Sequence, residues 1–157
     1  MKTLTHPFTP RIPPLALTFL VGVGARATAH AIPALRLESV HLAVLAAVFG
    51  LLGVACSLLG VVSFRRAHTT LNPMKPAAAT TLVVSGIYGF TRNPMYLGFL
   101  LLLLGEIAWL GNAAALITAP MLMFYLNHLQ IAPEEFALRE RFGAEFAAYT
   151  ARVPRWL

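Results

Sequence analysis

The chain of 157 residues is long enough for one domain, and its composition sets it apart from soluble proteins. Hydrophobic residues make up 58% of it and charged residues only 11%, and the apolar residues come in long runs, which indicates an integral membrane protein. The basic residues behind the net charge of +6 cluster beside these runs, which favours lipid headgroups over nucleic acid as their partner. The single cysteine, Cys56, excludes an intramolecular disulfide.

Four apolar segments predict an all-α membrane domain with about four transmembrane helices. We expect spans at about residues 13–35, 41–64, 94–110 and 113–131. The first segment also has features of a signal peptide, but we expect a span because three further apolar segments follow it. Small residues recur in the second segment at spacings of four and three, so another helix of the same chain or of a homodimer partner can pack closely there: Ala46, Gly50, Gly53, Ser57 and Gly60.

Two residues interrupt the apolar third and fourth segments. Glu106 is an intramembrane acid, and such a residue suggests function, but it lies about one turn from the glycine turn at Gly111 and can reach the interface. A structural role is therefore favoured for Glu106. Pro120 predicts a kink in the fourth span.

The chain changes from an apolar to a charged composition at Pro133. Proline and the acids Glu134 and Glu135 suit the first turn of a helix. Apolar residues then follow on one helical face: Leu138, Phe142, Phe146, Tyr149 and Val153. We expect an amphipathic helix over about residues 133–151 that lies on the membrane or caps the bundle.

The distribution of basic residues predicts the orientation. With four spans, the N-terminus, the 65–93 loop and the C-terminal helix share one side of the membrane. Only Arg26 and Arg36 fall on the opposite side of the membrane. The side with the N-terminus, the loop and the C-terminal helix holds Lys2, Arg11, Arg65, Arg66, Lys75, Arg92, Arg139, Arg141, Arg152 and Arg155. The crowded side is predicted to be cytoplasmic, with both termini there.

Two polar clusters are expected to meet on the cytoplasmic side. In the first, a glycine-punctuated loop leads to Asn93, a favourable N-cap, and Pro94, a favourable first helical residue. Because the Gly111 turn makes the third and fourth spans antiparallel neighbours, the clusters should face each other. The first cluster is Tyr88, Arg92, Asn93 and Tyr96, and the second is Asn127, His128, Glu134, Glu135, Arg139 and Arg141.

Cationic, anionic and aromatic groups at a membrane surface suit a zwitterionic cytosolic cofactor and a lipid-side substrate. Each residue also has a structural interpretation: Arg92 could mark the membrane edge, and Glu134 and Glu135 could complement the helix dipole. The sequence contains no CxxC, HExxH, P-loop, GxSxG or GxGxxG motif, so metal, nucleotide-phosphate and serine-hydrolase chemistry lack their usual supports.

Two ordered motifs resemble the signature of the isoprenylcysteine carboxyl methyltransferase and phospholipid methyltransferase superfamily. The first is Leu-Val-Val-Ser-Gly-Ile-Tyr at 82–88, followed by Thr-Arg-Asn-Pro-Met-Tyr-Leu-Gly at 91–98. The second is Glu-Glu-x-x-Leu-x-x-x-Phe-Gly from Glu134, followed by Phe146, Tyr149 and Val-Pro-Arg-Trp at 153–156. Asn93 is common in bacterial members, where eukaryotic ones usually have histidine. The resemblance covers roughly residues 60–157.

The resemblance implies a membrane methyltransferase that binds S-adenosylmethionine between the last two spans and the C-terminal helix. By position, one wall of the pocket would contain Tyr88, Arg92, Asn93, Pro94, Tyr96 and Gly98, and the other His128, Glu134 and Glu135. Glu135 would pair with the cofactor's ammonium or lie near its sulfonium. An arginine would bind the cofactor's carboxylate or orient an anionic substrate. Because Arg139 and Arg141 point about 200° apart on a helix, only one can face the pocket, and we favour Arg141.

The sequence leaves the methyl acceptor open among lipid amines, prenylated carboxylates, thiols and other apolar molecules. A carboxylate or thiolate needs no base, whereas an amine would need one, for which Glu135 or His128 is a candidate. Two other functions stay open: an NADPH-dependent membrane reductase of the sterol-reductase type, and a non-enzymatic membrane scaffold. The methyltransferase should bind S-adenosylhomocysteine, the reductase NADPH and the scaffold neither.

Overall fold

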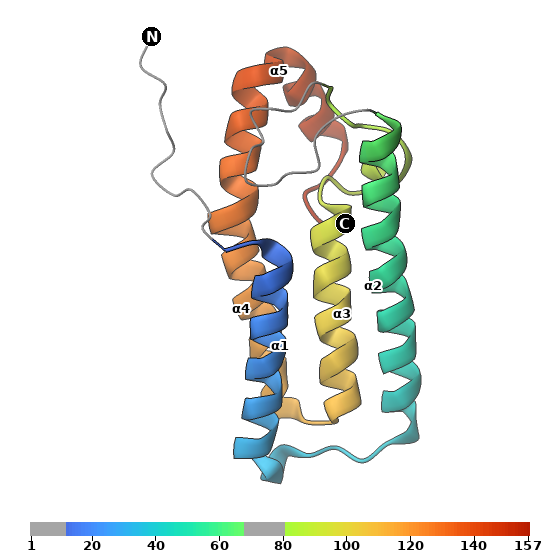
Figure 1. Cartoon of the computed structure of the whole chain (residues 1–157), viewed down its shortest axis with the longest axis vertical. Helices are drawn as coiled ribbons and strands as arrows, with labels where there is room; N and C mark the ends of the chain where they lie inside the picture. The colour runs from blue at the N-terminus through green and yellow to red at the C-terminus, as the bar shows by residue number, and fades with distance from the viewer. Residues whose placement is uncertain (1–11, 68–80) are drawn as a thin grey trace.

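The computed structural model describes residues 12–67 and 81–157, and within these ranges every regular element is a helix (Figure 1). Helices α1 (Pro14–Ala31) and α2 (Val40–Arg66) are joined through the 3-10 helix η1 (Pro33–Leu35). The 3-10 helix η3 (Gly86–Gly89) precedes α3 (Pro94–Leu110). The 3-10 helix η4 (Ala113–Ile117), α4 (Thr118–Tyr125), the π-helix η5 (Leu126–Ile131) and α5 (Ala132–Arg152) complete the chain. Three of the basic residues used to predict orientation, Lys2, Arg11 and Lys75, lie outside the described residues.

Two helical stretches are long and apolar enough to cross a membrane, Val40–Arg66 and Ala113–Arg152, and α3 is a shorter apolar helix. In the second stretch, residues 113–131 contain no Asp, Glu, Lys or Arg, whereas α5 contains several. Because ionised side chains are costly in the bilayer core, the membrane part of this stretch ends near Ile131. The predicted all-α membrane fold is confirmed.

Helix α1 is shorter than the predicted first span. It ends at Ala31 instead of near residue 35, because Pro33 disfavours the helical conformation at the residue before it. Ile32 accordingly has φ −126° and ψ 67°. The following residues, up to Val40, are exposed and lead to α2.

Helix α3 lies between α1 and α2 (Figure 1). The predicted small-residue face of α2 packs against α3 of the same chain: a Cβ atom built on Gly53 would lie 2.8 Å from the Gly98 carbonyl oxygen. One built on Gly98 would overlap Ser57 Oγ. These glycines therefore let the two backbones touch, as small residues do in membrane bundles.

An ion pair on the surface of the bundle joins α1 to α3. Arg26 Nε donates a hydrogen bond to Glu106 Oε1 at 2.5 Å. The carboxylate rests against Gly22, where a Cβ atom would lie 2.5 Å from Glu106 Oε2. This arrangement agrees with the structural role favoured for Glu106.

The turn between α3 and α4 also secures α1. Gly111 caps α3 with φ 56°, a left-handed conformation that favours glycine. The buried Asn112 amide donates to the carbonyls of Ala29 and Ile32 at 3.2 and 2.9 Å, and its oxygen accepts from the Ala114 N–H. One side chain thus satisfies carbonyls at the end of α1 and starts the next element.

The predicted kink at Pro120 is wrong. Pro120 lies in the first turn of α4, where its missing N–H costs little. The helical stretch that includes α4 and α5 instead changes its hydrogen-bond pattern at η5, where the Ala132 N–H bonds to the carbonyl of Asn127, five residues back. It bends again at Gly143, which has φ 48° and ψ −116°, so that the end of α5 returns toward the start of α3 (Figure 1).

The amphipathic helix has a core of its own. Its predicted apolar residues Phe146, Tyr149 and Val153 form a buried cluster, against which Leu82 from the loop before α3 packs. Helix α5 therefore caps the bundle and holds the loop beneath it. The main core lies between α1, α3, α4 and η5, and includes Leu103, Leu122, Leu126 and Ile131.

Candidate functional site

The loop before α3 is held from two sides through Tyr88. Its ring packs edge-on against Phe64 of α2, with the centroids 5.3 Å apart. Its carbonyl accepts a 2.8 Å hydrogen bond from the Tyr149 hydroxyl of α5. The Tyr88 side chain is buried, and this burial raises its pKa. Tyr88 thus anchors the loop, whether or not it also contacts a ligand.

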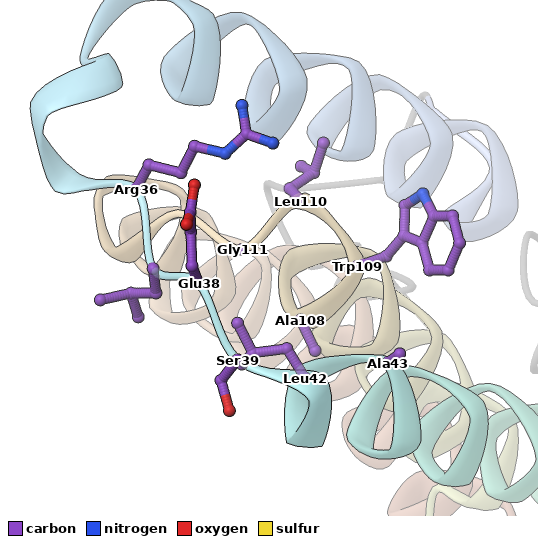
Figure 2. Close-up of a pocket in the computed structure, with 10 residues that line it drawn as sticks. Arg36, Glu38, Ser39, Leu42, Ala43, Ala108, Trp109, Leu110 and Gly111 are labelled. Carbon is purple, nitrogen blue, oxygen red and sulfur yellow. The ribbon is translucent and has the colours of Figure 1, made fainter.

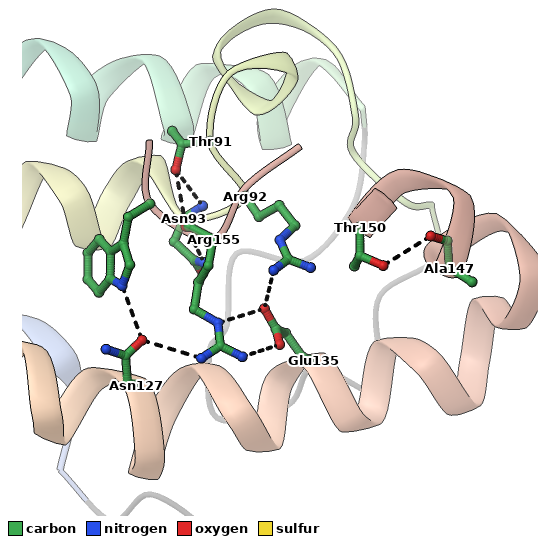
Figure 3. Close-up of polar contacts among 9 residues, drawn as sticks. Thr91, Arg92, Asn93, Asn127, Glu135, Ala147, Thr150 and Arg155 are labelled. Carbon is green, nitrogen blue, oxygen red and sulfur yellow. Dashed lines mark hydrogen bonds and ion pairs between the residues drawn. The ribbon is translucent and has the colours of Figure 1, made fainter. Parts of the chain in front are cut away.

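The loop also pairs with the tail that follows α5. The Asn93 amide donates to the Arg155 carbonyl at 2.9 Å (Figure 3). The Arg92 N–H donates to the Pro154 carbonyl at 3.0 Å. Thr91 Oγ1 donates to the same Arg155 carbonyl at 3.3 Å. Asn93 occupies the N-cap position of α3, as predicted, but its side chain forms no cap hydrogen bond. The amide ties the tail across the start of α3 instead.

Glu135 lies between two arginines at this junction. Arg155 binds its carboxylate through two hydrogen bonds, Nε to Oε1 at 3.1 Å and Nη2 to Oε2 at 2.6 Å. Arg92 Nη2 lies 3.3 Å from Glu135 Oε1 (Figure 3). The side chains of Arg92 and Glu135 are only 14% and 17% exposed. Two guanidinium groups on one carboxylate leave a positive excess in a sheltered position, which suits an anionic ligand group.

Asn127 supports this group from η5. Its Oδ1 accepts hydrogen bonds from Trp156 Nε1 at 3.1 Å and, at the longer distance of 3.5 Å, from Arg155 Nη1. The Trp156 ring packs against the main core. The α3 start, η5, α5 and the tail therefore meet at Glu135 (Figure 3).

Glu134 has different neighbours from Glu135. Its Oε1 accepts hydrogen bonds from the Tyr96 hydroxyl at 2.5 Å and from Gln130 Nε2 at 2.6 Å. Burial is the main cause that raises the pKa of Glu134 to about 7, although both hydrogen bonds lower it. A carboxyl group with this pKa can take up or release a proton near neutral pH.

Two predicted site residues lie elsewhere. His128 is exposed, and its ring contacts Phe124 with the centroids 4.5 Å apart. Arg141 is exposed, with its guanidinium carbon 5.9 Å from the centre of the Phe142 ring. The arginines at Glu135 are Arg92 and Arg155, so the preference for Arg141 is not supported by the geometry.

The remaining predicted residues lie around the start of α3. Pro94 is the first residue of that helix and is buried, and Tyr96 reaches Glu134. Gly98 faces α2, where it allows the close approach to Gly53. A contact between Gly98 and the cofactor stays a prediction.

Sequence reasoning missed Arg155 and Gln130 as site residues. Arg155 stands in the Val-Pro-Arg-Trp motif, which was used only to identify the family resemblance. Gln130 could have been found from spacing, because Asn127, Gln130 and Glu134 follow at intervals of three and four in an apolar helix. Such a polar stripe is a signal that a membrane helix faces a polar site.

Known proteins resemble parts of this chain. The model of the phospholipid methyltransferase family matches residues 41–145, which include Arg92, Glu134 and Glu135. An uncharacterized protein of Haemophilus influenzae is 43% identical over 63 residues, 40% of this chain and 100% of that protein. Protein-S-isoprenylcysteine O-methyltransferase of Schizosaccharomyces pombe is 33% identical over 73 residues, 46% of this chain and 31% of that protein.

Protein-S-isoprenylcysteine O-methyltransferase B of Arabidopsis thaliana is 29% identical over 94 residues, 60% of this chain and 48% of that protein. The chain thus spans about half or less of the length of these two named methyltransferases. No solved structure matches the chain with significance.

Proposed function

The chain belongs to the phospholipid methyltransferase family, and from this premise we propose that it transfers a methyl group from S-adenosylmethionine to a membrane-embedded or apolar acceptor. The reaction would take place at the cytoplasmic face of a bacterial inner membrane, where the polar cluster around Glu135 meets the bilayer. The acceptor would be a lipid amine, a carboxylate or a thiol.

The main support is the pair of arginines that flank Glu135. Arg92 Nε is buried and has no hydrogen-bond partner among the described residues. Buried N–H groups of this kind are rare, and this one indicates that an acceptor group belongs beside it. The amino-acid end of S-adenosylmethionine combines a carboxylate with an ammonium, and the cluster offers guanidinium and carboxylate groups to both. The residues present therefore fit this cofactor.

Each residue has a role that follows from its chemistry. Arg92 and Arg155 would bind the carboxylate of the cofactor, and Glu135 its ammonium. Asn127 holds Arg155 and Trp156 in place, so that the tail covers the site and limits the access of water. The cofactor, when bound, supplies a methyl group on a cationic sulfur, and the chain's main task is to align the acceptor with it.

Glu134 is better suited to act as a base than Glu135 or His128. Its pKa of about 7 allows it to accept a proton from an ammonium acceptor near neutral pH. Glu135 is occupied by two arginines, and His128 is exposed beside Phe124. A carboxylate or thiolate acceptor would leave Glu134 with a binding role only.

The first test is calorimetric binding of S-adenosylhomocysteine to the detergent-purified protein. We expect binding by the wild-type chain, and about tenfold weaker binding by Glu135→Gln because a charge-assisted contact is lost. Glu145→Gln is the matched control, since Glu145 is exposed on the same helix and should not affect binding.

NADPH serves as the competing ligand in the same experiment. If well-folded protein binds NADPH and does not bind S-adenosylhomocysteine, the methyltransferase proposal is contradicted and a reductase is favoured. Failure to bind either ligand would favour a membrane scaffold.

A further inference from the structure

Two adjoining cavities lie along the seam between α2 and α3, at the end of the bundle opposite Glu135. The first, of about 280 Å³, lies between the α1–α2 connection and the end of α3 (Figure 2). The second, of about 360 Å³, extends along the seam past Gly50 of α2 and Gly105 of α3. Ala43 and Trp109 line both, so we treat them as one feature, the seam groove.

The charged end of the seam groove contains one cation and one anion. Arg36 and Glu38 both line it, and Figure 2 shows the Glu38 carboxylate pointing toward the Arg36 side chain. Both residues are exposed, and neither forms an ion pair with a residue in the described ranges. The other acid on the groove, Glu106, already pairs with Arg26. Arg36 and Glu38 are therefore the charges open to a ligand.

Apart from Glu106, the residues that line the rest of the seam groove are apolar. Small residues of α2, including Ala46 and Gly50, and Leu102 of α3 line it. Trp109 lies at the junction of the two parts and is largely exposed, as a residue at the membrane–water interface often is. Polarity therefore falls along the groove from the end of the bundle toward its centre, as it does along a lipid molecule.

We propose that the seam groove binds a phospholipid with a zwitterionic headgroup. The lipid phosphate would lie at Arg36, its ammonium at Glu38, and the upper part of one acyl chain along Ala46 and Gly50. A single cation beside a single anion matches a zwitterion better than an anionic headgroup, because an anionic lipid would leave Glu38 facing negative charge. Bilayer phospholipids have direct access to a groove on a transmembrane seam.

This lipid is separate from the acceptor of the proposed reaction. Helix α3 has 17 residues and runs from the Glu135 site to the charged end of the groove, so Arg36 and Glu38 lie about 25 Å from that site. The proposal does not depend on methyltransferase activity, and its test uses no cofactor.

Two glycines provide a matched pair of variants. A Cβ atom on Gly50 would meet nothing within 4 Å, so Gly50→Leu should fill the groove without disturbing the fold. Gly24 on α1 also has nothing within 4 Å of its Cβ position and does not line the groove, which makes Gly24→Leu the control.

The experiment is native mass spectrometry of the detergent-purified chain with added phosphatidylethanolamine. We expect one bound lipid for wild type and Gly24→Leu, and about tenfold weaker binding for Gly50→Leu. Unchanged binding by Gly50→Leu would overturn the proposal. The proposal would also be overturned if Gly50→Leu converted a dimer into a monomer and left lipid binding unaltered. The groove would then be occupied by a second copy of the chain.

Headgroup selectivity is tested with phosphatidylglycerol, which lacks the ammonium. Arg36→Gln should weaken the binding of both lipids, whereas Glu38→Gln should weaken phosphatidylethanolamine about tenfold and leave phosphatidylglycerol unchanged or tighter. Both side chains are exposed, so these changes should not affect folding. Equal binding of the two lipids by wild type and by Glu38→Gln would overturn the assignment of a zwitterionic headgroup.

Discussion

At the scale of single residues, Glu134 and Glu135 show how neighbours in sequence acquire different chemistry. Glu135 meets two arginines, one from the start of α3 and one from the tail. Glu134 meets the neutral groups of Tyr96 and Gln130. One carboxylate is therefore compensated by positive charge, and the other is not. Pairs of acids in contrasting environments are typical of sites that bind charge with one group and move a proton with the other.

The raised pKa of Glu134 predicts a pH-dependent stability. Its folded-state pKa of about 7 lies above the ordinary glutamate value of about 4.3, so the folded chain holds the proton more tightly. Protonated Glu134 therefore contributes to the free energy of unfolding. This contribution is fully present below about pH 4 and is lost as pH rises through about 7. Glu134→Gln keeps a neutral oxygen acceptor for Tyr96 and Gln130, so it should escape this loss.

The measurement is a thermal melt in detergent from pH 5 to pH 8. We expect the melting temperature of Glu134→Gln to exceed that of wild type by several degrees at pH 8, with a smaller difference at pH 5. Glu145→Gln, an exposed change on the same helix, should differ from wild type by the same amount at every pH. A pH-independent difference for Glu134→Gln would show that Glu134 does not titrate in this range.

At the scale of elements, the π-helix η5 decides how the fourth span presents its polar side chains. Pro133 has no N–H for the carbonyl of Leu129, and its ring crowds the preceding turn, so a regular α-helix is disfavoured there. The chain accommodates this with the wider bond between Ala132 and Asn127. This bond spans five residues where an α-helical bond spans four. Compared with a regular α-helix, the one additional residue changes the angle between Asn127 and Glu135 around the helix axis by about 100°.

Replacing Pro133 should therefore alter the site without unfolding the helix. In Pro133→Ala, η5 can relax to a regular α-helix, which rotates Glu134 and Glu135 away from their partners. We expect about tenfold weaker S-adenosylhomocysteine binding in calorimetry, with helical content by circular dichroism unchanged. Pro120→Ala is the control, because Pro120 lies in the first turn of α4. Wild-type affinity in Pro133→Ala would show that Pro133 does not determine this geometry.

At the scale of the whole molecule, the orientation in the membrane follows from the distribution of charge. The described arginines at the end that contains Glu135 include Arg65, Arg66, Arg92 and several in α5, whereas Arg36 lies at the opposite end. Positively charged loops are retained in the cytoplasm. The Glu135 end is therefore predicted to face the cytosol, where a soluble cofactor is available.

Labelling of single cysteines tests this orientation. In a Cys56→Ser background, Leu35→Cys marks the α1–α2 connection and Ala144→Cys marks α5, and both positions are exposed. A maleimide that does not cross membranes should label Leu35→Cys in bacterial spheroplasts, and should label Ala144→Cys at least about tenfold less until the membrane is permeabilised. Stronger labelling at Ala144→Cys before permeabilisation would reverse the orientation.

The sequence by itself determined the elements and the general place of the site. Apolar runs, the Gly111 turn and the charge change after Pro133 are local patterns, so they indicated the helices with approximate ends. The two polar clusters were also expected to meet, because the short turn at Gly111 forces α3 and α4 to be antiparallel. Pro120 was misjudged, since its effect depends on whether it falls in the first turn of a helix or in the interior.

The tertiary structure alone decided which side chains meet within the site. Arg155 and Glu135 are separated by most of α5, and they pair because Gly143, with φ 48°, bends that helix back toward α3. The same bend places the Arg155 carbonyl where Asn93 can donate to it, so Asn93 ties the tail instead of capping its helix. The direction of such a bend depends on the packing of Phe146 and Tyr149, which hydrophobic periodicity does not specify. The long-range contacts of Arg155 and Asn93 therefore could not be predicted from local sequence patterns.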